Sequence, residues 1–390
     1  MKRVLKICPA VWKNASRDKR ELSVCQELGM ETVVMDKGAP TDSFRKDEID
    51  GFPVYHFSTR PLGTARCLIP LNRVFTLFLW GQKARKFHAD IITGHDLPGL
   101  FVGYLSNLGT SHKAKLVYDS HEFEIGRSDK RTVFQTWVIR RLERFLIKRS
   151  AFSIIVNDSM ADEVQRIHHL KDRPVVARNV PPFWELNPQE TVRIRGEFLR
   201  ELGMPEDSFL IMYHGMLFKN RGIENLLHAI ALTPGTAAII LGDGDSIYAA
   251  TLVALCDELG ITDRVLFRPA VPVEELRNYV SAADAGISLL QPVVQNHILA
   301  LPNKFFENIQ SLTPLIVSDF PTIGDLTDRY GIGLRVNPDN PEEISAAICR
   351  LKDDQKFYAA CKDNLRRAKK DLCWEKEKMA LKEAYRRIME

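Results

Sequence analysis

A short stretch in the second half of the sequence, Leu301–Glu307, combines a lysine with a carboxylate at helical spacing. Pro302 at its start is typical of the first turn of a helix, where its missing N–H costs nothing. Asn303, Lys304 and Glu307 stand three or four residues apart, so they share one helical face. A helix N-terminus and a lysine suit a diphosphate, and a carboxylate one turn later accepts hydrogen bonds from two vicinal ribose hydroxyls. The spacing predicts a nucleotide clamp, with a surface Lys–Glu pair as the alternative.

The loop after an expected strand at 209–213 combines glycine with basic side chains. Gly215 allows the backbone to approach a ligand closely, and Lys219 and Arg221 can neutralise phosphate beside the positive end of the next helix. This loop is a second candidate for a diphosphate site, with a solvated turn as the alternative. His214, at the strand end, is equally compatible with a hydrogen-bonded core histidine.

The turn at 241–245 contains two glycines, Gly242 and Gly244. Glycines directly after a strand suit a tight strand-to-helix turn against a ligand. The turn lacks the full G-x-G-x-x-G spacing and the acidic residue about twenty positions later that a dinucleotide site needs. We therefore expect no NAD site here.

Two expected strands in the first half end in titratable side chains, namely His95, Asp96, His121 and Glu122. Such groups directly after β-branched residues are predicted to lie at the carboxyl ends of parallel strands, where open α/β sheets bind ligands. Capping of the following helix explains Asp96 equally well, because Pro98 would stand in its first turn. For His121, a functional role is favoured over hydrogen-bonded packing.

Short β-branched runs alternate with longer amphipathic segments along the chain, which is typical of parallel-sheet α/β units. In the first half we expect strands at 4–7, 32–35, 54–57, 91–93, 116–118, 153–156 and 175–177, and helices at 18–28, 71–88, 98–108, 131–149 and 159–168. In the second half we expect strands at 209–213, 237–241, 265–268, 286–289, 315–318 and 334–336, and helices near 222–231, 247–258, 273–281, 303–311 and 341–351. Two polar helices follow, at 354–370 and 373–389.

A chain of 390 residues is too long for one ordinary core and suits two domains. Prolines and a loss of periodicity after residue 180 mark a linker between them. The expected fold class is α/β, with two Rossmann-like domains whose parallel sheets face each other across a deep cleft. The expected boundaries are an N-terminal domain at 1–182, a linker at 183–195, a C-terminal domain at 196–370, and a C-terminal helix at 371–390 that packs back toward the N-terminal domain.

The composition is that of a globular protein, with 45% hydrophobic and 27% charged residues. A net charge of +4 is too small to predict nucleic-acid binding. The seven dispersed cysteines lack a C-x-x-C pair, so they indicate neither a disulfide framework nor a zinc site. The apolar run near the start is too short for a signal peptide, and no run approaches the ~20 residues of a membrane span. We expect a cytoplasmic protein.

Two segments of the first half, 71–87 and 140–149, mix apolar and basic residues as interfacial helices do. They suggest peripheral contact with an anionic membrane at the inner face of the cell membrane. In the alternative interpretation, 71–87 packs in the core and the arginines face water.

Five strings in this order carry a family resemblance: HDLPGL (95–100), KLVYDSHE (115–122), ARNVPP (177–182), GDG (242–244) and LPNKFFE (301–307). With them the chain resembles glycosyltransferase family 4, the retaining GT-B enzymes, over essentially its full length. The resemblance implies a GT-B fold with a nucleotide-diphosphate sugar bound mainly by the C-terminal domain. The acceptor would bind in the N-terminal domain, on the side of His95, Asp96 and Glu122.

The resemblance also implies roles for single residues. Glu307 would bind the ribose, Arg221 the diphosphate, and His121 the donor sugar, which makes these three the candidate catalytic residues. The two glycines of the turn at 241–245 would lie beneath the donor. Gly215, Lys219, Asn303 and Lys304 complete the candidate donor site.

The sequence departs from the family pattern at two positions. Leu299 stands where members commonly carry the first glutamate of an E-x7-E pair, and Met216 where many have a first basic phosphate ligand. LPNKFFE recurs in a branch without that glutamate, so the loss suggests a subfamily character. Lys304 and Lys219 are candidates to compensate for Met216.

Cleavage of the bond between the anomeric carbon and phosphate builds negative charge on the diphosphate, so fixed positive groups lower the barrier. Arg221, Lys219 and helix ends can supply this charge, and we expect activity without a metal or cofactor. The expected reaction transfers a hexose-type sugar from a UDP- or GDP-sugar to a glycan or lipid-linked acceptor, in bacterial surface polysaccharide biosynthesis. The alternatives are a nucleotide-sugar epimerase on the same scaffold and a catalytically silent nucleotide-binding partner of another transferase.

Overall fold

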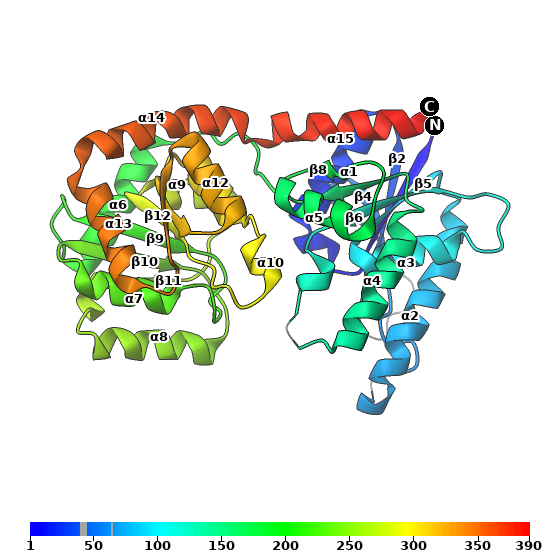
Figure 1. Cartoon of the computed structure of the whole chain (residues 1–390), viewed down its shortest axis with the longest axis horizontal. Helices are drawn as coiled ribbons and strands as arrows, with labels where there is room; N and C mark the ends of the chain where they lie inside the picture. The colour runs from blue at the N-terminus through cyan, green and yellow to red at the C-terminus, as the bar shows by residue number, and fades with distance from the viewer. Residues whose placement is uncertain (40–44, 64, 129) are drawn as a thin grey trace. The chain divides into compact units, whose positions relative to one another are not determined.

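The computed structural model describes residues 1–39, 45–63, 65–128 and 130–390, which form two compact units (Figure 1). Unit 1 comprises Met1–Arg178 and Lys378–Glu390, and unit 2 comprises Asn179–Glu377. Each unit is built around one largely parallel β-sheet with helices packed against it. The expected α/β fold class is confirmed.

The sheet of unit 1 has the strand order β3-β4-β2-β1-β5-β6-β7-β8. Its strands are parallel apart from the β3–β4 pair: β1 (Arg3–Cys8), β2 (Glu31–Lys37), β3 (Arg45–Ile49), β4 (Phe52–Phe57), β5 (Ile91–His95), β6 (Lys115–Ser120), β7 (Phe152–Ile155) and β8 (Val175–Val176). The sequence analysis missed β3, because this edge strand is polar and mostly exposed and carries no apolar alternation. The order reverses between β1 and β5, where sheets of this kind bind ligands.

The helices of unit 1 are α1 (Ser16–Glu27), α2 (Ile69–Ala84), α3 (Asp96–Ser106), α4 (Val133–Ile147), α5 (Asp158–His168) and most of α15 (Trp374–Met389), with 3-10 turns at Trp12–Asn14, Arg66–Leu68, Arg85–Phe87 and Glu124–Gly126. Helix α15 contributes to the core of this unit. Its Tyr385 is buried, with the hydroxyl 2.9 Å from Oγ1 of Thr93 on β5 and the ring against Phe152. No helix in the described parts of the chain has the length and apolar character needed to cross a membrane.

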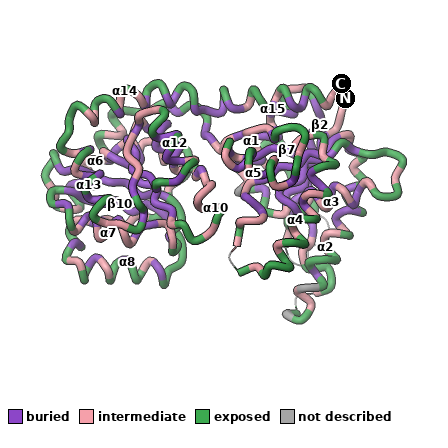
Figure 2. The backbone as a smooth tube through the Cα atoms, in the orientation of Figure 1, coloured by how far each residue is buried: buried purple, intermediate pink, exposed green. Residues whose placement is uncertain are grey.

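The sheet of unit 2 is parallel throughout and has the order β11-β10-β9-β12-β13-β14. Its strands are β9 (Phe209–His214), β10 (Thr236–Leu241), β11 (Val265–Arg268), β12 (Ala285–Ser288), β13 (Leu315–Ser318) and β14 (Gly333–Val336). Alternate residues of β9 enter different apolar clusters, with Ile211 and Tyr213 in one and Leu210 and Met212 in the other. Both faces of this sheet are therefore covered, as its continuous apolar strands require (Figure 2).

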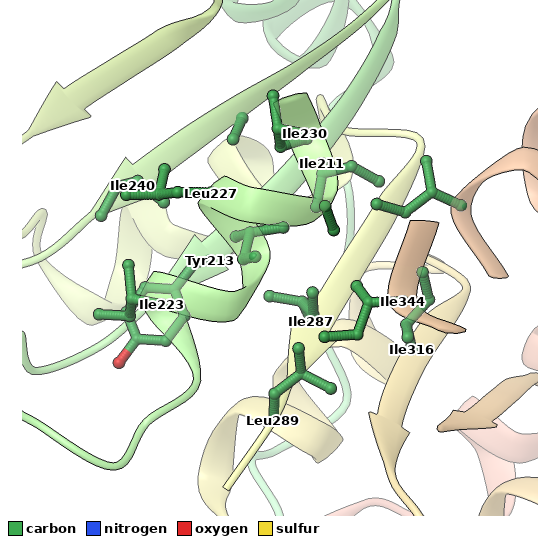
Figure 3. Close-up of a cluster of buried hydrophobic side chains, with 14 of the residues drawn as sticks. Ile211, Tyr213, Ile223, Leu227, Ile230, Ile240, Ile287, Leu289, Ile316 and Ile344 are labelled. Carbon is green, nitrogen blue, oxygen red and sulfur yellow. The ribbon is translucent and has the colours of Figure 1, made fainter. Parts of the chain in front are cut away.

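The helices of unit 2 are α6 (Pro188–Leu202), α7 (Ile223–Leu232), α8 (Ser246–Glu258), α9 (Val273–Ser281), α10 (Gln295–Ile298), α11 (Asn303–Gln310), α12 (Pro321–Tyr330), α13 (Pro341–Asp353) and α14 (Gln355–Asp371), with a 3-10 turn at Thr262–Arg264. One apolar cluster joins β9, α7, β12 and α13 (Figure 3). It holds the ends of β9 and β10 rigidly, so the loops that follow them start from fixed points.

The unit boundaries differ from the expected ones. The chain passes between units at 178–179 and at 377–378, whereas boundaries at 182 and 370 were expected. Much of the expected linker at 183–195 is helical, because α6 begins at Pro188 with Asn187 as its cap. The proline that suggested a linker occupies the first helical turn, a position that tolerates proline. Ile194 and Phe198 of α6 are buried against the sheet.

Candidate functional site

The loop after β9 and the turn after β10 lie against each other in unit 2. The backbone N–H of Gly215 donates a hydrogen bond to the carbonyl of Leu241 over 2.9 Å. A Cβ atom on Gly242 would lie 1.9 Å from the carbonyl oxygen of Gly215, and one on Gly244 would lie 2.2 Å from that of Leu217. Both distances are far below van der Waals contact, so glycine is required at each position for this close approach.

Helix α11 presents Glu307 next to the end of β9. Phe305 and Phe306 are fully buried and fix the helix against the sheet. The Glu307 Oε2 atom is 2.9 Å from Nε2 of His214, which is itself buried. One carboxylate oxygen is thus engaged by the protein, and the structure records no partner for Oε1 in the described chain.

Lys304 lies on the same helix, beside the loop after β9. Its Nζ atom is 3.8 Å from the centroid of the Tyr213 ring, and a Cβ atom on Gly215 would lie 3.6 Å from it. Burial of the amine and the nearby charge of Arg221 lower the pKa of Lys304 to about 7, although Glu307 partly opposes them. The amine is therefore a cation held among groups that disfavour its charge.

The basic residues of this region form no ion pair within the part of the chain that the structure describes. Across the described residues, no ion pair is recorded for Lys304, Arg221 or Lys219. The helices that begin here also lack side-chain caps, since Gly222 precedes α7 and Pro302 precedes α11. Uncapped N–H groups and unpaired cations make this a region of positive potential that suits an anion.

The structure places the predicted donor residues of unit 2 as follows. Arg221 lies near enough to Lys304 to affect its pKa, and Lys304 lies on the same helix as Glu307 and beside Gly215. Lys219 is exposed on the loop between β9 and α7, and no contact with these groups is recorded. The exposed side chain of Asn303 accepts a hydrogen bond of 2.6 Å from Nδ2 of Asn179.

Unit 1 contains a buried ionic network at the ends of β1, β5 and β6. Lys6 of β1 is 1% exposed, and its ammonium lies 2.7 Å from Asp18, 3.4 Å from Glu21 and against Asp119. Arg17 bonds Glu21 over 2.7 Å and Asp119 over 3.2 Å. Each buried charge in the network thus has at least one opposite charge in contact, as stability requires.

The two candidate histidines of unit 1 complete this network. Nε2 of His121 lies 3.1 Å from Asp119, and Nδ1 of His95 lies 2.9 Å from Asp18, with the two rings 3.9 Å apart. Burial alone would lower the pKa of each, but the carboxylates outweigh it, raising the pKa of His121 and bringing that of His95 to about 11.

Asp18, His95, Asp119 and His121 offer ligand atoms within 4.8 Å of one another, which raises the question of a metal ion. The Lys6 ammonium already contacts both carboxylates. Burial alone would lower the pKa of Lys6, but these carboxylates raise it well above the ordinary value. A metal would have to displace this cation, so the donor set is arranged for an ion-pair network.

Asp96 and Glu122 lie beside His121 and have structural partners. Asp96 does not cap α3 with its side chain; its Oδ1 accepts the backbone N–H of His121 over 2.9 Å. Its other oxygen lies 3.2 Å from Arg127, which also contacts Glu122 over 2.6 Å. The capping interpretation of Asp96 is therefore wrong, and this carboxylate instead orients the His121 loop.

The sequence analysis missed the residues that hold these sites. Lys6 and Asp119 are charged residues inside otherwise apolar strands, and that signal could have identified them, because a buried charge needs a partner. His214 was recognised as a core histidine or a ligand contact, but not as the residue that holds Glu307. Arg17 and Asp18 were not among the predicted site residues.

The chain is similar to known proteins in sequence and in fold. Residues 195–368 match the family described as Glycosyl transferases group 1. The chain is 27% identical over 388 residues to the uncharacterized glycosyltransferase MJ1607 of Methanocaldococcus jannaschii, covering 94% of this chain and 93% of that protein. It is 25% identical over 320 residues to the teichuronic acid biosynthesis glycosyltransferase TuaC of Bacillus subtilis, covering 81% of this chain and 75% of that one.

The fold is also found in solved structures. HepE of Anabaena, solved with UDP and with UDP-glucose, is similar with a TM-score of 0.75 and 16% identity over 100% of both chains. At this identity the similarity shows the fold alone. The chain therefore has the GT-B fold, and residues 195–368 of its unit 2 are similar to the Glycosyl transferases group 1 family.

Proposed function

We propose that the protein is a glycosyltransferase that binds a nucleotide-diphosphate sugar at the carboxyl ends of β9 and β10. The observation that carries this proposal is the pairing of unpartnered cations, Lys304 and Arg221, with a carboxylate, Glu307, that His214 holds in place. The fold agrees with it, since HepE has this fold and was solved with UDP and UDP-glucose.

In this proposal, each group at the site has a separate task. The free oxygen of Glu307 accepts hydrogen bonds from ribose hydroxyls. Lys304 and Arg221 bind the diphosphate together with the uncapped N-termini of α7 and α11, because all four sources are positive. Gly242 and Gly244 keep the turn free of side chains beneath the donor.

The proposed reaction is a metal-independent transfer with retention at the anomeric carbon of a hexose-type sugar. The bond from that carbon to the diphosphate oxygen breaks, a bond to the acceptor oxygen forms on the same face, and the acceptor proton passes to the leaving phosphate. Arg221 and Lys304 lower the barrier because negative charge grows on the diphosphate in the transition state. No side chain acts as a nucleophile in this scheme.

Unit 1 would bind the acceptor. The raised pKa of His121 makes its imidazolium a hydrogen-bond donor for a sugar hydroxyl. The proposed acceptor is a glycan or lipid-linked sugar in surface polysaccharide biosynthesis, at the cytoplasmic face of the cell membrane. The similarity to a relative named for teichuronic acid biosynthesis supports this choice.

Calorimetric titration with UDP, GDP and ADP tests the donor site first. The proposal expects one diphosphate to bind and Glu307→Ala to weaken it, and no binding of any nucleotide would contradict it. The matching nucleotide sugars are then incubated with and without candidate acceptors. Sugar interconversion without an acceptor would indicate an epimerase, and nucleotide binding without any donor consumption would indicate a silent partner.

A further inference from the structure

The outer face of helices α2 and α4 in unit 1 is apolar and exposed. The exposed side chains follow helical spacing on each helix: Leu71, Val74, Phe75 and Phe78 on α2, and Val133, Phe134, Trp137 and Val138 on α4. Val133 is 89% exposed and Phe134 71%. Core packing, the alternative for segment 71–87, is therefore wrong for these α2 residues, which form a stripe that faces solvent.

Helix α3 joins the two stripes into one surface. It packs between α2 and α4, and its aromatic side chains contact both neighbours (Figure 1). Phe101 of α3 lies 6.5 Å from Phe78 of α2, and Tyr104 of α3 lies 5.3 Å from Phe145 of α4, measured between ring centroids. We name the outer side of α2, α3 and α4 the aromatic face.

The charge on the aromatic face has one sign. The only acidic residues in these three helices are Asp96 and Glu143, and both are buried and have partners within the protein. The exposed basic residues in and directly after these helices are Arg73, Lys83, Arg85, Lys86, Arg140, Arg141, Lys148 and Arg149. Aromatic side chains flanked by cations, without exposed carboxylates, are complementary to an apolar layer bounded by anions.

The fold of unit 1 does not require these exposed side chains. None of residues 133–142 is buried, and α4 is anchored through Glu143, Leu146 and Ile147 at its other end. Helix α2 is held from its inner side, where Trp80 Nε1 donates to Ser58 O over 3.1 Å. Large exposed aromatic residues that stabilise nothing inside the protein indicate a partner outside it.

We propose that the aromatic face docks on an anionic lipid bilayer, with the first turns of α4 and the stripe of α2 entering the interface. Trp and Phe side chains favour the boundary between headgroups and acyl chains, and the flanking arginines and lysines bind lipid phosphates. Helix α2 has 16 residues, so it lies on the membrane and does not cross it. This surface is separate from the proposed donor site, so either proposal can fail without the other.

Trp137 provides a direct test, because it is the one exposed tryptophan. It is 53% exposed, whereas Trp12, Trp80, Trp184 and Trp374 are 0 to 7% exposed. The full-length protein is mixed with vesicles of phosphatidylcholine, alone or with phosphatidylglycerol, and acrylamide quenching of tryptophan emission is followed. We expect anionic vesicles to shift the emission to the blue and protect it from quenching, and neutral vesicles to do neither at low salt.

Flotation with the same vesicles tests which residues of the aromatic face bind the membrane. We expect the double variant Phe134→Ser with Val138→Ser to lower the bound fraction at least tenfold. The matched control, Val192→Ser with Ile247→Ser, changes two exposed apolar residues of unit 2 and should bind like wild type. To test the charge, Arg140→Glu with Arg141→Glu should abolish binding, whereas Arg367→Glu with Lys370→Glu on α14 of unit 2 should not.

Three results would overturn the proposal. If the protein does not float with anionic vesicles, it does not bind an anionic membrane. If the Phe134/Val138 variant and its control bind the vesicles equally well, the aromatic face is not the surface that binds them. A dimer in sedimentation velocity that the Phe134/Val138 variant converts to monomer would show that a second copy, and not lipid, covers this face.

Discussion

The two ionic clusters of the molecule occupy equivalent places in their sheets but differ in how their charges are paired. In unit 1, Lys6 and Arg17 each contact carboxylates, and the network is closed. In unit 2, Lys304 and Arg221 have no recorded ion pair in the described chain, and the nearby Glu307 is bound to a histidine. A closed network of ion pairs has a structural role, whereas cations without an ion pair near a glycine turn are suited to bind an anion.

The largest expected effect comes from opening the closed network. Lys6→Met leaves Asp18 and Asp119 buried without their shared cation, and removing one partner of a buried pair costs ~3–5 kcal/mol. We expect the free energy of unfolding of unit 1 to fall by this amount in urea denaturation. Lys37→Met, at an exposed position on β2, should change it by less than about 0.5 kcal/mol. Equal stability of both variants would show that the network does not stabilise unit 1.

In unit 2, removal of the carboxylate should weaken binding most, and it should also cost about 1–3 kcal/mol of stability because the buried His214 loses its partner. Glu307→Ala loses charge-assisted hydrogen bonds of ~1.5–3 kcal/mol each, which corresponds to a loss in UDP affinity of about a hundredfold or more. Calorimetric titration measures it, with Glu258→Ala on the exposed side of α8 as the control. Unchanged affinity in Glu307→Ala would exclude this residue from the site.

A pH series distinguishes the cluster of unit 2 from that of unit 1, because burial and the charge of Arg221 lower the pKa of Lys304 to about 7. A diphosphate favours the protonated amine, so binding takes up a proton and UDP affinity should fall as pH rises above about 7, by up to tenfold per pH unit. Folding stability should change in the opposite direction, because the unfolded state binds more protons between pH 7 and the ordinary lysine value.

Titrations in buffers of different ionisation enthalpy measure the proton uptake directly. Lys304→Arg keeps the charge at every pH, so its affinity should be flat over the same range. A wild-type affinity that does not depend on pH would show that Lys304 does not bind the diphosphate.

The smallest effect is expected at Lys219, which is exposed on the loop and has no recorded contact. An exposed charge interacts weakly through water, by about 0–1 kcal/mol. Lys219→Ala should therefore lower UDP affinity less than about fivefold, and far less than Arg221→Ala in the same titration. A larger loss at Lys219 than at Arg221 would reverse the assignment of the diphosphate contacts.

Local patterns explain which parts of the fold could be predicted from the sequence. Buried strands such as β9 and β10 are apolar runs between turn residues, so their positions could be predicted within a residue or two. Helix α6 could not, because Pro188 suggests a linker as readily as a helix start. The polar strand β3 depends on its neighbour β4 and shows no pattern of its own.

The candidate sites were predictable only where their residues share one element. Lys304 and Glu307 are neighbours on α11, and helical spacing alone places them on one face. The contact between His214 and Glu307 spans 93 positions in sequence, and that between Lys6 and Asp119 spans 113, so both depend on how the strands assemble. The periodicity of apolar residues within one helix or strand does not predict contacts between such distant positions.

The position of Tyr385 in the sequence determines which of the two units can complete its folding first during synthesis. Its ring and hydroxyl complete the interior of unit 1 next to Thr93, yet it follows the whole of unit 2 in the sequence. A nascent polypeptide can finish unit 2 while its first 178 residues still lack this helix. We therefore expect the earlier part of the chain to be the later to mature, and to depend on chaperones until α15 has been synthesised.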